Sequence, residues 1–206
     1  MSDNERTMVT DRRVQGYADV LGFNSPEDLK TELEGKQVLD AGSGEGNLKK
    51  DLGEDFNITN LDVRHIPSSN SVQAMGEFMP FKENTFDTIL CNHSLFFYAQ
   101  DKDDMTLEEG ITKQAKETFR VLKPNGKLHI VLLPLNRKYE ATPNEDSKFA
   151  VYTSVDRKTD ELTFLPTLKV LKDVGFNIDK AENFKTVVKG SENLVLTRAV
   201  LSKMGQ

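Results

Sequence analysis

The residues with the clearest chemical meaning are a glycine-rich turn and an acid that follows it. Gly42, Gly44 and Gly46 follow a short apolar run that ends near Asp40. Glycines between a strand and a helix allow positive φ and let a ligand approach the backbone closely. Asp62 ends the next predicted strand, about 20 residues after Gly42, where a carboxylate can accept hydrogen bonds from ribose hydroxyls. This combination predicts a nucleoside-binding site. The alternative is a turn required only for strand–helix packing.

The spacing of the glycines argues against a dinucleotide. The dinucleotide fingerprint G-x-G-x-x-G needs a third glycine where this chain has Asn47. Asp40 stands two residues before Gly42, and its charge would repel a neighbouring pyrophosphate. The same carboxylate suits a cofactor with an ammonium or sulfonium group. A nicotinamide oxidoreductase is therefore the weaker alternative.

The elements that position these residues alternate between strands and helices. Apolar runs predict strands at residues 37–40, 58–63, 72–75, 85–92 and 128–133, a small strand at 151–155, and a final hairpin of strands at 176–188 and 194–201. Helices are expected in four places. The first is the mostly polar segment 12–34, and the second runs from the glycine turn to Leu52. The third follows a capping box at 106–109, and the fourth runs from Pro166 to Gly175. A tight turn is expected at 123–126. Residues 63–70 are too few for a covering helix, so either this crossover is a loop or the third strand is misplaced.

This alternation predicts an α/β fold. We expect a single Rossmann-like domain over residues 1–206, with a seven-stranded, mostly parallel sheet, an antiparallel C-terminal hairpin strand and helices on both faces. Residues 1–35 form an N-terminal helical segment in this prediction. Residues 134–165 form a long insertion over the active face, suited to substrate binding or to a lid.

Composition excludes several classes of protein. The chain has 206 residues, a formal charge of −6 and an apolar fraction of 37%, which is typical of a globular protein without a general basic surface for nucleic acid. No apolar stretch is long enough to span a membrane, and residues 1–10 lack a signal-peptide core. The single cysteine, Cys91, predicts a reducing, cytoplasmic setting. The scattered histidines and cysteine predict no metal site.

Four segments together resemble the class I S-adenosylmethionine-dependent methyltransferases, in their compact methyltransferase-domain form. Residues 38–46 are similar to the family's first motif, and Asp62 to its ribose-binding acid. Residues 77–81 with 84–90 resemble the region of its third and fourth strands, and 119–128 its following helix, turn and strand. The resemblance covers about 36–133. Two departures are Met75, where many relatives have an acid, and the missing helix after Asp62.

The resemblance implies S-adenosylmethionine as cofactor and a role for particular residues. Asp40 would hold the ammonium, Asp62 would accept the ribose hydroxyls and Val63 would pack on the adenine. The backbone at Ala41, Gly42 and Gly44 would line the methionine portion. The backbone near Gly76 and Glu77 would face the adenine edge, and the Cys91 carbonyl would lie near the amino group or the sulfonium.

Catalytic and substrate residues are less defined. Methyl transfer requires alignment more than a reactive side chain. His93 is the candidate base, or else it only hydrogen-bonds its loop. Asn92 is a candidate to orient an acceptor, or else a helix cap.

Substrate contacts are expected from Tyr17, which could equally pack on the sheet edge, and from Tyr139 and Tyr152 in the insertion. Acids and bases balance in that insertion, which favours a small-molecule acceptor. An RNA or protein methyltransferase, or a non-catalytic partner subunit of the same fold, remain the alternatives. No membrane partner is expected.

Overall fold

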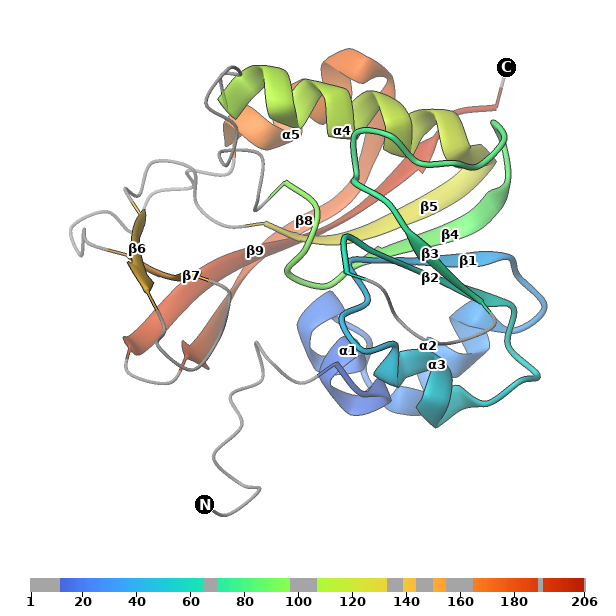
Figure 1. Ribbon diagram of the computed structural model, residues 1–206, viewed down its shortest axis with the longest axis horizontal. Helices are drawn as coiled ribbons and strands as arrows, with labels where there is room; N and C mark the ends of the chain where they lie inside the picture. The colour runs from blue at the N-terminus through green and yellow to red at the C-terminus, as the bar shows by residue number, and fades with distance from the viewer. Residues whose placement is uncertain are drawn as a thin grey trace.

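The computed structural model describes residues 12–64, 70–96, 107–132, 139–143, 150–154, 165–188 and 191–205. Within them, seven strands form one sheet in the order β3-β2-β1-β4-β5-β9-β8 (Figure 1). These strands are β1 (Val38–Ala41), β2 (Ile58–Asp62), β3 (Ser71–Gln73), β4 (Phe86–Cys91), β5 (Leu122–Leu132), β8 (Phe176–Val188) and β9 (Ser191–Lys203). Neighbours from β3 to β5 pair in parallel, and β9 is antiparallel to both β5 and β8. The predicted α/β sheet is confirmed.

Helices cover both faces of this sheet, as Figure 1 shows. On one face lie α1 (Val14–Leu21), α2 (Pro26–Leu33) and α3 (Asn47–Leu52), and on the other lie α4 (Leu107–Val121) and α5 (Leu165–Val174). Every residue of β1 is buried. Leu39 packs in the core cluster that includes α4 and α5 residues, whereas Val38 packs in the cluster that includes α1 and α2 residues. Burial on both faces is the reason that this strand reads as a continuous apolar run.

The N-terminal segment is helical, as predicted. It forms two helices, because Gly22 adopts a left-handed conformation (φ 86°) and its N–H bonds the Ala18 carbonyl to end α1. The interpretation of this segment as mostly polar is wrong for α1. Five of its eight residues are buried against the sheet: Gly16, Tyr17, Ala18, Val20 and Leu21.

The sheet also differs locally from the prediction. β5 begins at Leu122 instead of Leu128, and the expected turn at 123–126 is an irregularity within the strand, where pairing moves from Phe86↔Leu122 to Thr88↔Lys127. Asn125, with φ 63°, provides the tight geometry there. The third strand is confirmed, since β3 pairs with β2.

The predicted insertion at 134–165 contains a second small sheet. β6 (Tyr139–Pro143) and β7 (Ala150–Ser154) pair antiparallel. The strand predicted at 151–155 corresponds to β7, and the sequence reading missed β6. The rest of the insertion before α5 lies outside the described residues, as do the side chains of Tyr139 and Tyr152.

A charged cluster ties α2 to the edge of β5. Glu32 Oε1 lies 2.8 Å from Lys36 Nζ and 3.8 Å from both Lys127 Nζ and His129 Nε2. Interaction with His129 and then with Lys36 lowers the pKa of Glu32 to about 2. Because this carboxylate is ionised more easily in the folded chain than in the unfolded chain, it stabilises the fold above its ordinary pKa of 4.5.

We predict that Glu32→Gln lowers the free energy of unfolding at pH 7 by about 1 kcal/mol, a value that allows for solvent screening. The difference from wild type should shrink as the pH falls from 4.5 toward 2, because wild-type Glu32 is then protonated. Urea unfolding at several pH values measures it. The control is Glu27→Gln, which removes an exposed pair with Lys30. A gap that is constant with pH, or equal in the control, would contradict this role of Glu32.

Candidate cofactor-binding site

The glycine turn lies at the carboxyl end of β1 and is tied to β2. The Leu61 carbonyl accepts hydrogen bonds from the N–H groups of Gly42 (2.6 Å) and Ser43 (3.1 Å). Gly42, Gly44 and Gly46 all have positive φ, between 64° and 71°. The local prediction of a strand, a glycine turn and a helix is confirmed, and the backbone conformation explains the residue type.

Gly42 has a second reason to be glycine. A Cβ added there would overlap the Cβ of Ser94, and the Ser94 hydroxyl donates to the Ala41 carbonyl. The turn after β1 and the loop after β4 are therefore packed directly against each other. A similar contact lies farther along the sheet edge, where a Cβ on Gly76 would overlap Leu95.

We predict that Gly42→Ala destabilises the protein by about 3 kcal/mol or more, since it adds a steric overlap to the strain of a positive φ. Gly35→Ala is the matched control. Gly35 also has positive φ (70°), but nothing lies within 4 Å of its added Cβ, so only a backbone cost of about 1–2 kcal/mol is expected. Thermal unfolding compares the two. Equal losses would show that Ser94 does not constrain the turn.

Asp40 is a fully buried carboxylate beside this turn. The Tyr17 hydroxyl donates to its Oδ1 at 2.6 Å, while its Oδ2 accepts no hydrogen bond from the described residues. Burial raises the pKa of Asp40 to about 6, although the Tyr17 hydrogen bond and the positive charge of Arg12 oppose this. A buried acceptor without a donor is costly, and a cationic group placed beside it would satisfy it.

Asp62 faces the same turn from the end of β2. Its Oδ2 accepts from the Gly44 N–H at 2.9 Å. Its Oδ1 accepts from the backbone N–H of Arg64 at 3.0 Å and from Arg64 Nε at 3.1 Å. The two acids predicted from the sequence therefore lie on either side of the glycine turn, on adjacent strands.

The residues expected near an adenine ring lie along the same edge. Val63 is 56% exposed and Met75 is 41% exposed, so both offer apolar surface. The segment that holds Gly76 and Glu77 follows β3 and is joined to β2 by a hydrogen bond from the Ala74 N–H to the Asp62 carbonyl. Glu77 is buried. Their roles in binding adenine stay predictions.

Cys91 ends β4 next to the turn, Asn92 and His93 follow it, and all three are buried. Burial, and then the nearby charge of Asp40, raises the pKa of the Cys91 thiol, which is therefore an inert thiol at neutral pH. His93 Nδ1 lies 2.6 Å from Asn92 Oδ1. An amide oxygen only accepts, so this contact assigns the proton to Nδ1 of the neutral ring.

His93 is unusual in two ways. Its φ of 51° is rare for a residue with a side chain, and such strain is concentrated at functional sites. Burial, and then the positive charge of Arg12, lowers its pKa to about 3. An imidazole with this pKa is neutral at pH 7 and is a weak proton acceptor.

We predict that the His93 imidazole does not titrate between pH 8 and pH 5. NMR of the ring carbons measures this, with the signal assigned by its loss in a His93→Asn variant. Because its pKa is lowered in the folded chain, His93 should also reduce stability as the pH falls from its ordinary 6.5 toward 3. A titration midpoint near 6.5 would contradict this placement.

Of the predicted substrate residues, the structure describes the side chain of one. Tyr17 is fully buried, with its hydroxyl on Asp40, and its position fits support of that carboxylate instead of contact with a substrate. Tyr139 and Tyr152 lie on the β6–β7 sheet, and their contacts lie outside the described residues. The sequence reading missed Arg12, Arg64 and Ser94. Of these three, only Arg64 could have been predicted from the sequence, because a basic residue two positions after Asp62 is close enough to pair with its carboxylate.

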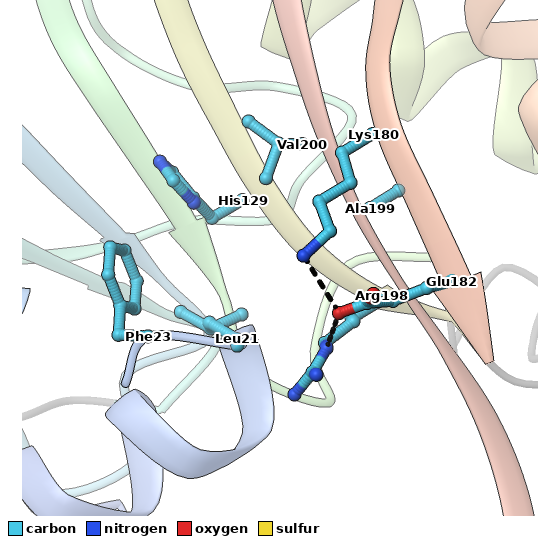
Figure 2. Close-up of a pocket in the computed structure, with 9 residues that line it drawn as sticks. Leu21, Phe23, His129, Lys180, Glu182, Arg198, Ala199 and Val200 are labelled. Carbon is cyan, nitrogen blue, oxygen red and sulfur yellow. Dashed lines mark hydrogen bonds and ion pairs between the residues drawn. The ribbon is translucent and has the colours of Figure 1, made fainter. Parts of the chain in front are cut away.

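A separate pocket of about 70 Å³ lies between the end of α1 and strands β5, β8 and β9 (Figure 2). Lys180 and Arg198 both pair with Glu182 beside it, at 3.0 and 2.6 Å. None of the predicted site residues lines it.

Two kinds of feature are absent from the described part of the chain. No three His, Cys, Asp or Glu residues there are grouped closely enough to hold a metal ion. None of the described helices combines the length and the apolar character needed to cross a membrane.

A mostly parallel sheet with a glycine turn after β1 and an acid at the end of β2 is typical of Rossmann-like folds, many of which bind nucleosides. Residues 39–130 match the family model described as a methyltransferase domain. This match spans less than half of the chain, and over that segment the chain is similar to methyltransferase domains, in agreement with the motifs.

Individual relatives and solved structures show the same similarity. The chain is 30% identical over 115 residues to the ubiquinone/menaquinone biosynthesis C-methyltransferase UbiE of Wigglesworthia glossinidia brevipalpis. That match covers 47% of this chain and 42% of the relative, so the chain spans less than half of the relative's length.

Two crystal structures share the fold. A methyltransferase from Methanosarcina mazei has a TM-score of 0.64 at 15% identity, covering 86% of this chain and 98% of its own. The 1,6-didemethyltoxoflavin-N1-methyltransferase of Burkholderia thailandensis, solved with 1,6-didemethyltoxoflavin and S-adenosylhomocysteine, has a TM-score of 0.62 at 15% identity, covering 98% of this chain and 80% of its own. At this identity the likeness concerns the fold alone.

Proposed function

We propose that this chain binds S-adenosylmethionine and transfers its methyl group to a small-molecule acceptor. The observation that carries the proposal is the buried Asp40 carboxylate, which has one oxygen without a donor among the described residues and lies beside the glycine turn. The cofactor's ammonium would satisfy that oxygen, and its charge would favour the ionised carboxylate.

Other groups at the same edge fit the rest of the cofactor. Asp62 stands where the ribose hydroxyls would bind, and the turn at Gly42 and Gly44 allows the methionine portion to approach the backbone. Ser43 Oγ and Asn92 Nδ2 are also buried without hydrogen-bond partners among the described residues. Exposed Val63 and Met75 offer apolar surface for an adenine ring.

When bound, the cofactor supplies a methyl group on a sulfonium, which needs no activation by a side chain. The chain's own residues then hold the acceptor in line and exclude water. His93 remains a candidate for contact with the acceptor, but a pKa of about 3 makes it a poor general base near neutral pH. We therefore propose that Asn92 and His93 orient the acceptor. This favours acceptors that are nucleophilic without a strong base.

The names of similar proteins support a small acceptor without identifying it. The UbiE relative is named a C-methyltransferase of quinone biosynthesis, and the Burkholderia thailandensis enzyme is named an N1-methyltransferase of 1,6-didemethyltoxoflavin. These acceptors differ in the atom that is methylated, so carbon and nitrogen acceptors both belong in the first assays. The buried thiol of Cys91, the only cysteine, supports our proposal of a reducing cytoplasmic setting.

We predict that S-adenosylhomocysteine binds the wild-type protein and that Asp62→Asn weakens binding by about 1–3 kcal/mol, because an amide NH₂ replaces one of the two oxygens that accept from the ribose hydroxyls and the charge that strengthens both bonds is lost. Isothermal titration calorimetry measures both affinities. The matched control is Asp87→Asn. Asp87 is also a strand acid, but it lies at the amino end of β4, opposite to the candidate site. There it pairs with Lys123 and accepts a hydrogen bond from the Gln37 N–H.

Two results would contradict the proposal. Absence of S-adenosylhomocysteine binding, or binding of NAD in its place, would remove the assigned cofactor. Binding without transfer of labelled methyl to any quinone, amine, RNA or protein acceptor would support a non-catalytic partner of the same fold instead.

A further inference from the structure

Arg12 bridges the two loops that frame the candidate site. One of its guanidinium nitrogens, Nη1, donates to the Gly42 carbonyl, and the other, Nη2, donates to the His93 carbonyl at 3.3 Å. Gly42 belongs to the turn after β1, and His93 to the loop after β4. A cofactor bound at the carboxyl ends of these strands would lie between the two loops that Arg12 connects.

The positive charge of Arg12 also acts on the buried acid of the site. It lowers the pKa of Asp40, against the larger effect of burial. The Arg12 side chain passes close to the glycine turn, because a Cβ added at Gly44 would lie 3.1 Å from Arg12 Cδ. Arg12 therefore supplies, from within the chain, the kind of charge that the proposed cofactor would bring.

Arg64 has a parallel position at the second acid. The same Cβ on Gly44 would lie 3.5 Å from Arg64 Nη2, so both arginines converge on one point of the turn. A carboxylate offers about four lone-pair sites, and three on Asp62 are used by Gly44 N–H, Arg64 N–H and Arg64 Nε. A ribose diol needs two acceptors, so Arg64 Nε must leave for both hydroxyls to bind.

We propose that Arg12 and Arg64 close the cofactor site of the unliganded protein by binding its glycine turn and its ribose acid, and that the cofactor must displace them. This inference rests on the proposed function. Arg12 is the main barrier, since it is partly buried and holds two backbone carbonyls. Arg64, with 45% of its side chain exposed, can move into water at little cost.

This arrangement has a thermodynamic signature that separates it from an ordinary binding contact. An interaction that exists only in the free protein stabilises the free protein and weakens the ligand's affinity by the same amount. Removing it therefore lowers the stability of the free protein and tightens cofactor binding. A residue that instead contacts the bound cofactor would show weaker binding when it is removed.

The test is calorimetric titration of S-adenosylhomocysteine into wild type, Arg12→Met and Arg64→Met, together with thermal unfolding of each free protein. We expect Arg12→Met to bind about fivefold to tenfold more tightly, as suits the loss of one or two competing hydrogen bonds, and to unfold at a lower temperature. Arg64→Met should bind more tightly by a smaller factor. Arg13→Met, at the adjacent exposed arginine, is the matched control and should bind as wild type does.

A further variant keeps the test decisive if Arg12→Met folds poorly. Arg12→Lys retains the charge but cannot span both carbonyls, so an intermediate affinity is expected. Equal or weaker binding by both Arg12 variants, with normal binding by wild type, would overturn the closed state and leave the proposed function intact. Absence of binding by every protein would overturn the proposed function and this inference with it.

Discussion

The buried carboxylate of Asp40 is the constraint on which much of the site depends. A charge removed from water requires partners, and here one oxygen receives the Tyr17 hydroxyl while Arg12 provides a nearby positive charge. Tyr17 can reach Asp40 only because α1 packs on the sheet through its buried face. The N-terminal helix is thus part of the site as well as of the core. A change that loosens α1 should also alter the acidity of Asp40.

The other face of the sheet contributes through α4. Gln114 Oε1 accepts from the Phe96 N–H at 2.6 Å and so holds the loop after β4 from the helix side. That loop packs through Ser94 against Gly42 and through Leu95 against Gly76. Glycines at these two points let the loop after β4 pack closely against the loops after β1 and β3. The geometry of the site is therefore set by packing contacts on both faces of the sheet.

The sequence predicted the parts of this arrangement that are encoded locally. The glycine turn, Asp62 and the parallel strands follow from residue types and short-range periodicity, and the structure shows each of them. The contacts of Arg12 with His93 and of Ser94 with Ala41 join residues 81 and 53 positions apart, and no local pattern indicates them. Tyr17 was expected either to contact a substrate or to pack on the sheet edge, and burial of α1 directs its hydroxyl to Asp40. β6 was missed because three of its five residues, Glu140, Ala141 and Pro143, are of types that are depleted in strands.

The affinity of such a site for its cofactor is the free-energy difference between two states, the free protein and the complex, each of which forms hydrogen bonds to the same groups. Before a ligand binds, Asp62 already accepts three hydrogen bonds, and Arg12 already bridges two carbonyls. A cofactor gains only the excess of its own contacts over these internal ones, apart from the one oxygen of Asp40 that has no donor among the described residues. The ammonium that would bind there is therefore the group with the least internal competition. In our proposal, the contact of the ammonium with Asp40 therefore contributes most to the binding free energy. The internal hydrogen bonds of Arg12 and Arg64 offset part of the free energy that the other cofactor contacts contribute.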